Sequence, residues 1–114
     1  MSGPPLSPAR CAGSLVFTSG QLARGDDGKI VAGGIEAQAE QALANLIAVL
    51  AAEGCTAADV VKVTAWLTDP RFGAAFNAAY RRHFGAPFPA RSTVVSALLA
   101  DGALIEVEAI AQRT

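Results

Sequence analysis

The sequence predicts an α+β fold with the element order ββαβαββ, in which two helices cover one face of a sheet. Two segments show the three-to-four-residue apolar spacing of amphipathic helices, and the segments around them alternate apolar and polar residues as strands do. A chain of 114 residues is too short to bury two separate cores. Residues 1–114 are therefore expected to form one domain.

The N-terminal part of the chain is predicted to be an extended arm followed by a β-hairpin. Residues 1–13 hold several prolines, which are incompatible with a helix interior. Leu15–Thr18 is expected to form the first strand. Asp26–Gly28 supplies residues that tolerate a tight turn, so Lys29–Val31 is expected to return as the second strand.

The middle of the chain predicts a long helix and then a central strand. Apolar residues recur with helical spacing over Ile35–Glu53, and Gly54 is placed to end the helix. Val60–Leu67 is apolar and β-branched, which favours a strand covered on both faces. Alternation along this strand places Val61 and Val63 on the same face.

A second helix and two closing strands complete the predicted order. Asp69–Pro70 is typical of a helix start, and Gly85–Pro87 ends a helix of about fourteen residues. The closing strands are expected over Arg91–Leu98 and Leu104–Ala111, joined by a turn at Asp101–Gly102.

In this arrangement no element of the chain covers the second face of the sheet. Apolar residues make up 52% of the chain and the mean hydropathy is +0.36, more than a domain of this size easily hides. Packing against other copies is the simplest way to keep this face from water. The sequence therefore predicts an oligomer.

Composition also excludes several classes of function. The net charge of −1 and pI near 5.7 provide no basic field for nucleic acid. The apolar segments are too short to span a bilayer, and the start of the chain lacks the features of a signal peptide, so a soluble cytoplasmic protein is expected. Cys11 and Cys55 lie far apart without metal-ligand neighbours, so isolated thiols and no metal site are expected.

The first candidate functional residue is Arg91, at the start of a predicted strand. The prolines of Pro87–Pro89 restrict the approach and would hold the guanidinium in a narrow range of positions, which suits a bidentate clamp for a carboxylate. Thr93 lies on the same face of this strand. A rim arginine paired with an acidic residue is the alternative.

Other polar residues carry weaker signals. Glu106 and Glu108 share one strand face, where they would either mark a wet surface or act on a water near a bound carboxylate. His83 lies in the last helical turn, where its charge favours a structural role. Gly33–Gly34 lacks the lysine of a phosphate loop, and Ser19 has no histidine partner that would make it a nucleophile.

Taken together, these segments resemble the RidA/YjgF family, also called the reactive intermediate deaminase family. The resemblance extends from residue 14 to the end of the chain. It is carried by the motifs Phe17–Gln21, Gln38 with Asn45–Leu46, Val60–Thr64, Phe76–Tyr80, Phe88–Ser92 and Ile105–Ala111.

The resemblance implies a chorismate-mutase-like fold with a mixed sheet, assembled as a homotrimer with a site in each cleft between neighbours. It implies hydrolysis of 2-imino or enamine acids to 2-oxo acids and ammonia, without a cofactor or metal. By position, Arg91 would bind the substrate carboxylate and Glu106 would position the attacking water. Ser19 and Asn77 match residues that line or support the cleft, and Thr93 lies beside the arginine.

Two positions depart from the family pattern. Leu6 stands roughly where well-characterised members carry a tyrosine that closes over the ligand, and Thr93 stands where many have cysteine. The departures keep a second hypothesis open, a non-catalytic protein that binds 2-oxo acids or a regulatory partner in the same clefts. Ribonuclease activity, as reported for some relatives, fits poorly with the acidic pI.

Overall fold

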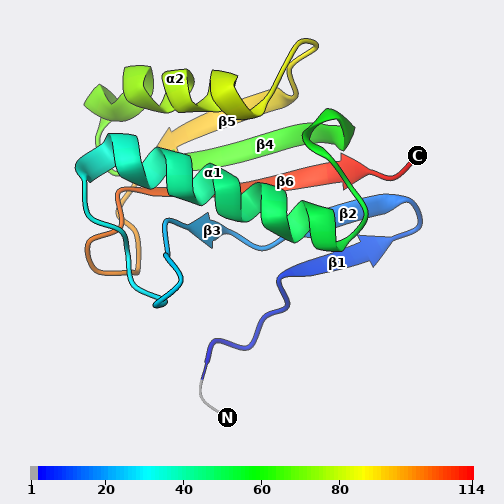
Figure 1. Ribbon diagram of the computed structural model, residues 1–114, viewed down its shortest axis with the longest axis horizontal. Coiled ribbons are helices and arrows are strands. Elements are labelled where there is room, and N and C mark those ends of the chain that lie inside the picture. Colours follow the sequence, from blue (N-terminus) through cyan, green and yellow to red (C-terminus); the bar gives the residue numbers. More distant parts are fainter. Residues whose placement is uncertain (1–2) are drawn as a thin grey trace.

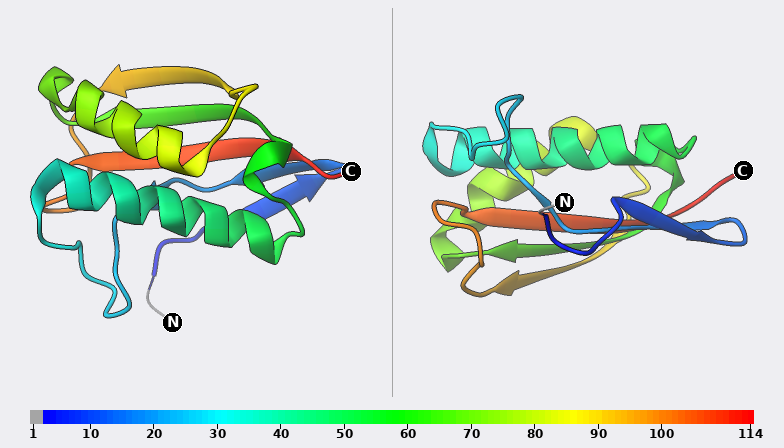
Figure 2. Two further views of the ribbon diagram at one scale, coloured as in Figure 1. Left: turned by 45° about the horizontal axis from the view of Figure 1, so that its top comes forward. Right: turned by 90° about the horizontal axis from the view of Figure 1, so that it is seen from below.

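The computed structural model describes residues 3–114 and shows two layers, with both helices on one face of a sheet (Figures 1 and 2). Helix α1 spans Gly34–Ala52 and helix α2 spans Gly73–His83. The predicted fold class is confirmed. Met1 and Ser2, the first residues of the predicted arm, lie outside the described residues. None of the helices in the described part is both long and apolar enough to cross a membrane.

The sheet is mixed, as the family resemblance implies. Its strands within residues 3–114 are β1 (Ala9–Ala12), β2 (Leu15–Thr18), β3 (Gln21–Leu22), β4 (Val60–Leu67), β5 (Ala90–Val95) and β6 (Ile105–Gln112). They lie in the order β1-β2-β6-β4-β5, and β3 pairs with β6 next to β2. Only the pairing of β4 with β5 is parallel among these strands. The strand β5 is the last in this order and forms one edge of the sheet.

The core lies between the helices and the inner face of the sheet. Alternate residues of β4 and β6 point into it, and the apolar stripe of α1 packs over them. The buried residues of α1 recur with the helical spacing seen in the sequence: Ile35, Gln38, Ala39, Ala42, Leu43, Leu46 and Leu50. The opposite face of the sheet is covered by neither helix (Figure 2).

The two glycines before α1 serve the backbone. Gly33 and Gly34 have φ angles of 113° and 72°, a region that side chains disfavour, and a Cβ on Gly33 would lie 2.7 Å from the Cβ of Ala37. The two glycines therefore allow the chain to enter helix α1, and they need no phosphate-binding role to explain them.

The helix start predicted at Asp69–Pro70 begins a 3-10 turn, and α2 itself begins at Gly73. The Asp69 carboxylate accepts a hydrogen bond from the Arg71 backbone N–H, and a 3-10 turn over Pro70–Phe72 leads into the helix. A second 3-10 turn, over Ala57–Asp59, precedes β4. Helix α2 lies beside β5 at the sheet edge (Figure 1), and its Asn77 accepts a hydrogen bond from Arg91 at the start of β5.

The N-terminal prediction is partly wrong. Lys29–Val31 is not a strand, since only an isolated bridge joins Arg24 to Ile30. The partner of β2 is instead β1, which lies inside the predicted arm and pairs through a turn at Gly13–Ser14. The four residues of β1 all pair with β2, which in turn pairs with β6 of the large sheet. These pairings outweigh the local turn signal at Asp26–Gly28.

Two further details of the strands differ from the prediction. A register shift between Val60 and Lys62 breaks the alternation of β4, so Val60 is buried while Val61 is 48% exposed and does not share the buried face of Val63. The strand β5 ends at Val95 rather than at Leu98. The residues that follow form a loop that bends back toward β6.

Candidate functional site

The start of β5 holds Arg91 against the second helix. Arg91 is in register with the buried Val63 of β4, so its side chain rises from the helix-covered side of the sheet edge. The guanidinium carbon lies 4.9 Å from the centre of the Phe76 ring and 4.7 Å from that of Tyr80. These cation–π contacts, from a helix packed on the core, restrict where the guanidinium can lie.

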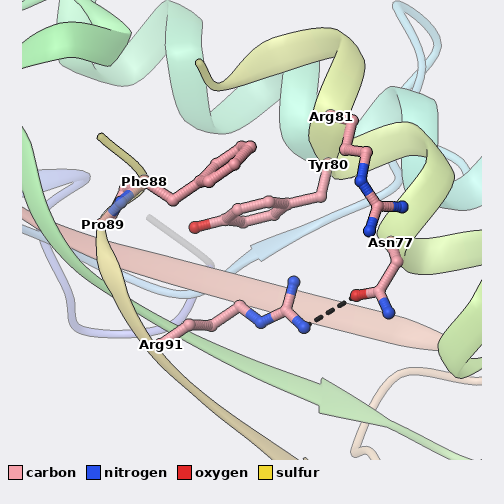
Figure 3. A pocket seen from close by; sticks show the side chains of 6 residues that line it. All are labelled: Asn77, Tyr80, Arg81, Phe88, Pro89 and Arg91. Atoms are coloured by element: carbon pink, nitrogen blue, oxygen red, sulfur yellow. Dashed lines mark hydrogen bonds between the residues drawn. The ribbon is translucent and has the colours of Figure 1, made fainter. Parts of the chain in front are cut away.

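A hydrogen bond from α2 orients the same group. Arg91 Nη2 donates to Asn77 Oδ1 at 2.7 Å (Figure 3). No acidic side chain of residues 3–114 forms an ion pair with Arg91, so the alternative of a rim arginine paired with an acid does not hold there. A guanidinium has five N–H donors, and its remaining ones can therefore serve an added carboxylate.

Arg91 faces a cavity of about 270 Å³, here called the arginine cavity. Its lining residues are Asn77, Tyr80, Arg81, Phe88, Pro89 and Arg91. The Tyr80 ring lies between the Phe88 ring and the guanidinium (Figure 3). Burial raises the pKa of Tyr80, whose hydroxyl has no hydrogen-bond partner among the described residues. The cavity thus combines a cationic fork with an aromatic wall.

Glu106 and Glu108 share a strand face, as predicted, but it is the face without helices. Their neighbours Ile105, Val107 and Ala109 point into the core. Both glutamates line a second cavity of about 240 Å³, here called the glutamate cavity. Its lining is Gly20, Trp66, Ser96, Ala97, Leu98, Leu99, Glu106 and Glu108. Partial burial, and then the nearby Glu106 charge, raises the pKa of Glu108.

The Glu106 carboxylate packs closely against Gly20. A Cβ at this glycine would lie 2.2 Å from Glu106 Oε2, so only glycine leaves space for the carboxylate in this position. Ser19, the neighbouring residue, ties down the N-terminal arm: its hydroxyl donates to the Ser7 carbonyl and its N–H to that of Pro8. Ser19 therefore holds the N-terminal arm next to Gly20, which packs against Glu106.

A third cavity of about 530 Å³ adjoins Glu106, here called the leucine cavity. Its lining is Pro4, Leu6, Gly20, Gln21, Leu22, Arg24, Asn45, Leu99, Ala100 and Glu106. Leu6, in the N-terminal arm, therefore lies in a cavity next to Glu106. Sequence spacing could not place Leu99 or Leu22 here, since they come from separate loops and strands.

Within one protomer the structure assembles two separate groups of the predicted residues. Arg91 and Asn77 meet in the arginine cavity, and Thr93, in register with Ala65, is exposed on the same side of β5. Glu106 lies on the opposite face of the sheet, in cavities that Arg91 does not line. Sequence reasoning missed the role of Gly20, although it lies inside the quoted motif Phe17–Gln21.

His83 lies outside these cavities. Its Nε2 is 2.8 Å from Glu40 Oε2, and Arg82 donates to the other oxygen of the same carboxylate. These two bonds lower the pKa of Glu40. His83 thus links α2 to α1, consistent with the expected structural role.

Comparisons with known proteins agree with this architecture. The family described as Endoribonuclease L-PSP matches residues 2–113. The 2-iminobutanoate/2-iminopropanoate deaminase of Capra hircus is 39% identical over 108 residues, covering 94% of this chain and 79% of that protein. The Salmonella typhimurium deaminase of the same name is 42% identical over 104 residues, covering 89% of this chain and 81% of that protein.

The fold is shared with solved structures as well. The crystal structure of RidA from the Antarctic bacterium Psychrobacter sp. PAMC 21119 has a TM-score of 0.91 at 34% identity, covering 98% of this chain and 91% of that one. The motifs, the fold and the matched relatives all point the same way. The chain belongs to the family described as Endoribonuclease L-PSP, which is the RidA/YjgF family that its sequence motifs resemble.

Proposed function

We propose that the protein hydrolyses the C=N bond of 2-imino acids and their enamine tautomers, releasing 2-oxo acids and ammonia. The observation that carries the proposal is the Arg91 guanidinium, stacked on two aromatic rings and hydrogen-bonded to Asn77, with donors left for a carboxylate. The names of the curated relatives support the same reaction class.

Arg91 would bind the substrate carboxylate through two parallel N–H···O bonds. Each charge-assisted hydrogen bond of this kind contributes about 1.5–3 kcal/mol. Because Asn77 and the Phe76 and Tyr80 rings already orient the guanidinium, little side-chain freedom is lost on binding. The site would therefore hold the substrate in one orientation, with its C2 carbon away from the clamp.

Glu106 would position and deprotonate the water that attacks C2. The water oxygen bonds to C2 as the C=N π electrons move onto nitrogen, and the carboxylate takes the water proton. The carboxylate then gives that proton to nitrogen and the C–N bond breaks. Ammonia leaves as the C2 hydroxyl loses its proton to the carboxylate and becomes the C=O group of the 2-oxo acid. A protonated imine is already electrophilic, so positioning is the main contribution required of the protein.

The two groups would act together across an interface between copies. Arg91 lies at the sheet edge on the helix side, whereas Glu106 lies on the open face, so one protomer presents the two groups in different directions. The open face and β5 expose apolar residues that a neighbour could cover: Phe17, Val94 and Val95. We propose a homotrimer with one site per interface, in which Ser19 supports the Glu106 side.

The test measures 2-oxo acid release from imines that an amino-acid oxidase generates in the assay. Arg91→Ala is expected to lower kcat/KM by roughly 100-fold or more, because two charge-assisted bonds are lost. Arg10→Ala, at an exposed arginine on the edge strand β1, is the matched control and should match the wild type. Equal rates for wild type and Arg91→Ala would overturn the assigned role.

A non-catalytic binder of 2-oxo acids is the second hypothesis. It is favoured by Leu6, which lies in the arm beside Glu106 and stands where the family resemblance leads us to expect a tyrosine that closes over the ligand. It predicts saturable 2-oxo acid binding in calorimetry with no imine turnover. Turnover that Glu106→Gln abolishes, with binding retained, would exclude it. The same purified variants can be tested on RNA, since cleavage lost on mutation of either residue would support the ribonuclease reading instead.

A further inference from the structure

The leucine cavity is an unassigned space beside the proposed reacting group. At about 530 Å³ it is larger than the arginine cavity at about 270 Å³ and the glutamate cavity at about 240 Å³. It shares Gly20, Leu99 and Glu106 with the glutamate cavity, so the two spaces meet at the Glu106 carboxylate. A molecule whose reacting carbon lies at Glu106 can therefore extend into the leucine cavity.

The walls of this cavity are largely apolar, and two of their leucine side chains are exposed to solvent in the protomer. Leu6 is 61% exposed, and Leu99 is fully exposed at the tip of the loop between β5 and β6. Leu22, in register with Glu106, contributes from β3. An aliphatic group that enters would remove leucine surface from water, which is favourable in proportion to the area covered.

Hydrogen bonds hold these walls in place without a ligand. Ser19 anchors the arm that carries Leu6. The Asn45 side chain donates to the carbonyls of Leu22 and Arg24, each at 2.9 Å, and fixes the opposite wall. The buried Gln38 amide bonds to two backbone groups at the base of the Leu99 loop. A preformed wall loses little freedom on binding, so it can discriminate between ligands.

One carboxylate and one guanidinium border the cavity. Glu106 supplies the carboxylate, and Arg24, which donates from Nη1 to the Gly28 carbonyl at 2.9 Å, keeps other N–H donors. An acidic group of a ligand would lie near the Glu106 charge but could bond Arg24. The apolar leucine walls, and not the charges, therefore carry the preference for an aliphatic group.

We propose that the leucine cavity binds the side chain of the substrate and makes the protein selective for 2-imino acids with branched or long aliphatic side chains. The inference rests on the proposed function, because it places C2 of the substrate at Glu106. Leu6 and Leu99 are the specificity-determining residues. The imine of leucine is the expected type of substrate, whereas the imine of alanine leaves the cavity unfilled.

The experiment measures binding of the matching 2-oxo acids, so that it does not depend on turnover. Trp66 is the only tryptophan of the chain and lines the glutamate cavity, which makes its fluorescence a local probe, with calorimetry as a second readout. The wild type is expected to bind 4-methyl-2-oxopentanoate at least about 10-fold more tightly than 2-oxopropanoate. Leu99→Ser should remove most of this preference by weakening the binding of 4-methyl-2-oxopentanoate.

Val61→Ser is the matched control, because Val61 is an exposed aliphatic residue that lines none of the three cavities. It should keep the wild-type preference. Equal affinities for the two acids, or a preference that survives Leu99→Ser, would overturn the inference. So would tighter binding of 2-oxoglutarate, which would assign the cavity to an acidic group at Arg24. If only the proposed function is wrong, the wild type would keep its preference for 4-methyl-2-oxopentanoate in the binding assay but would not hydrolyse imines.

Discussion

Substituting Gly20 tests whether the Glu106 carboxylate must lie where the structure places it. In Gly20→Ala the new methyl group would lie 2.2 Å from Glu106 Oε2, 2.9 Å from Cδ and 3.1 Å from Cγ. Non-bonded heavy atoms are most stable about 3.5–4.0 Å apart, so the carboxylate has to move by more than about 1 Å. Gly20 does not have a positive φ, so alanine fits the backbone itself.

The expected consequence is a loss of activity without a loss of stability. A misplacement of about 1 Å costs roughly 100-fold in rate, equivalent to about 2.7 kcal/mol in activation free energy. Because the atoms that must move belong to the end of one flexible side chain, the free energy of unfolding should stay within about 0.5 kcal/mol of the wild type. Initial rates of 2-oxo acid release and urea denaturation measure the two quantities on the same preparations.

Gly85→Ala is the control, since a Cβ there meets no atom within 4 Å and the residue has no positive φ. It should retain both the wild-type kcat and the wild-type stability. A Gly20→Ala protein with the wild-type kcat would refute the reasoning, because the carboxylate would then work equally well from another position. A loss of kcat that merely follows a comparable loss of folded protein would refute it too.

Two further predictions concern the frame around the site. Gln38→Ala should lower the free energy of unfolding by about 2–4 kcal/mol in denaturant titrations, because two backbone groups of the loop before β6 lose a buried partner. Glu40→Gln should lower it by about 0.5–1 kcal/mol at neutral pH, a small value because the carboxylate that bonds Arg82 and His83 is 42% exposed. Folding lowers the pKa of Glu40, so the stability difference between wild type and Glu40→Gln should be fully present above pH 4.5, the ordinary pKa of a glutamate. The difference should disappear as the pH falls through the pKa of Glu40 in the folded protein. A stability difference that grows as the pH falls through this range would contradict the prediction.

The long elements could be predicted from the sequence because their periodicity records burial. The strand β4 was expected over Val60–Leu67 and is found there, and α1 differs from its expected range by one residue at each end. Helical spacing in one and β-branched composition in the other are local properties of the chain. Such signals need no knowledge of what the element packs against.

Short strands could not be predicted in the same way. Asp26–Gly28 does form a turn, since the Lys29 N–H bonds to the Asp27 carboxylate, yet no strand follows it. Gln21–Leu22 pairs instead with β6, far away in the sequence. A strand of so few residues is stabilised by its partner, and its own sequence carries little information about which partner that is.

By itself the sequence determined which residues alternate together: Arg91 with Thr93, and Glu106 with Glu108. Only the tertiary structure decided that these pairs face opposite sides of the sheet, and that Gly20 and the leucine cavity border the Glu106 carboxylate. The physical reason is that alternation along a strand is set by backbone geometry, whereas the face that becomes buried is set by which helices and strands pack together.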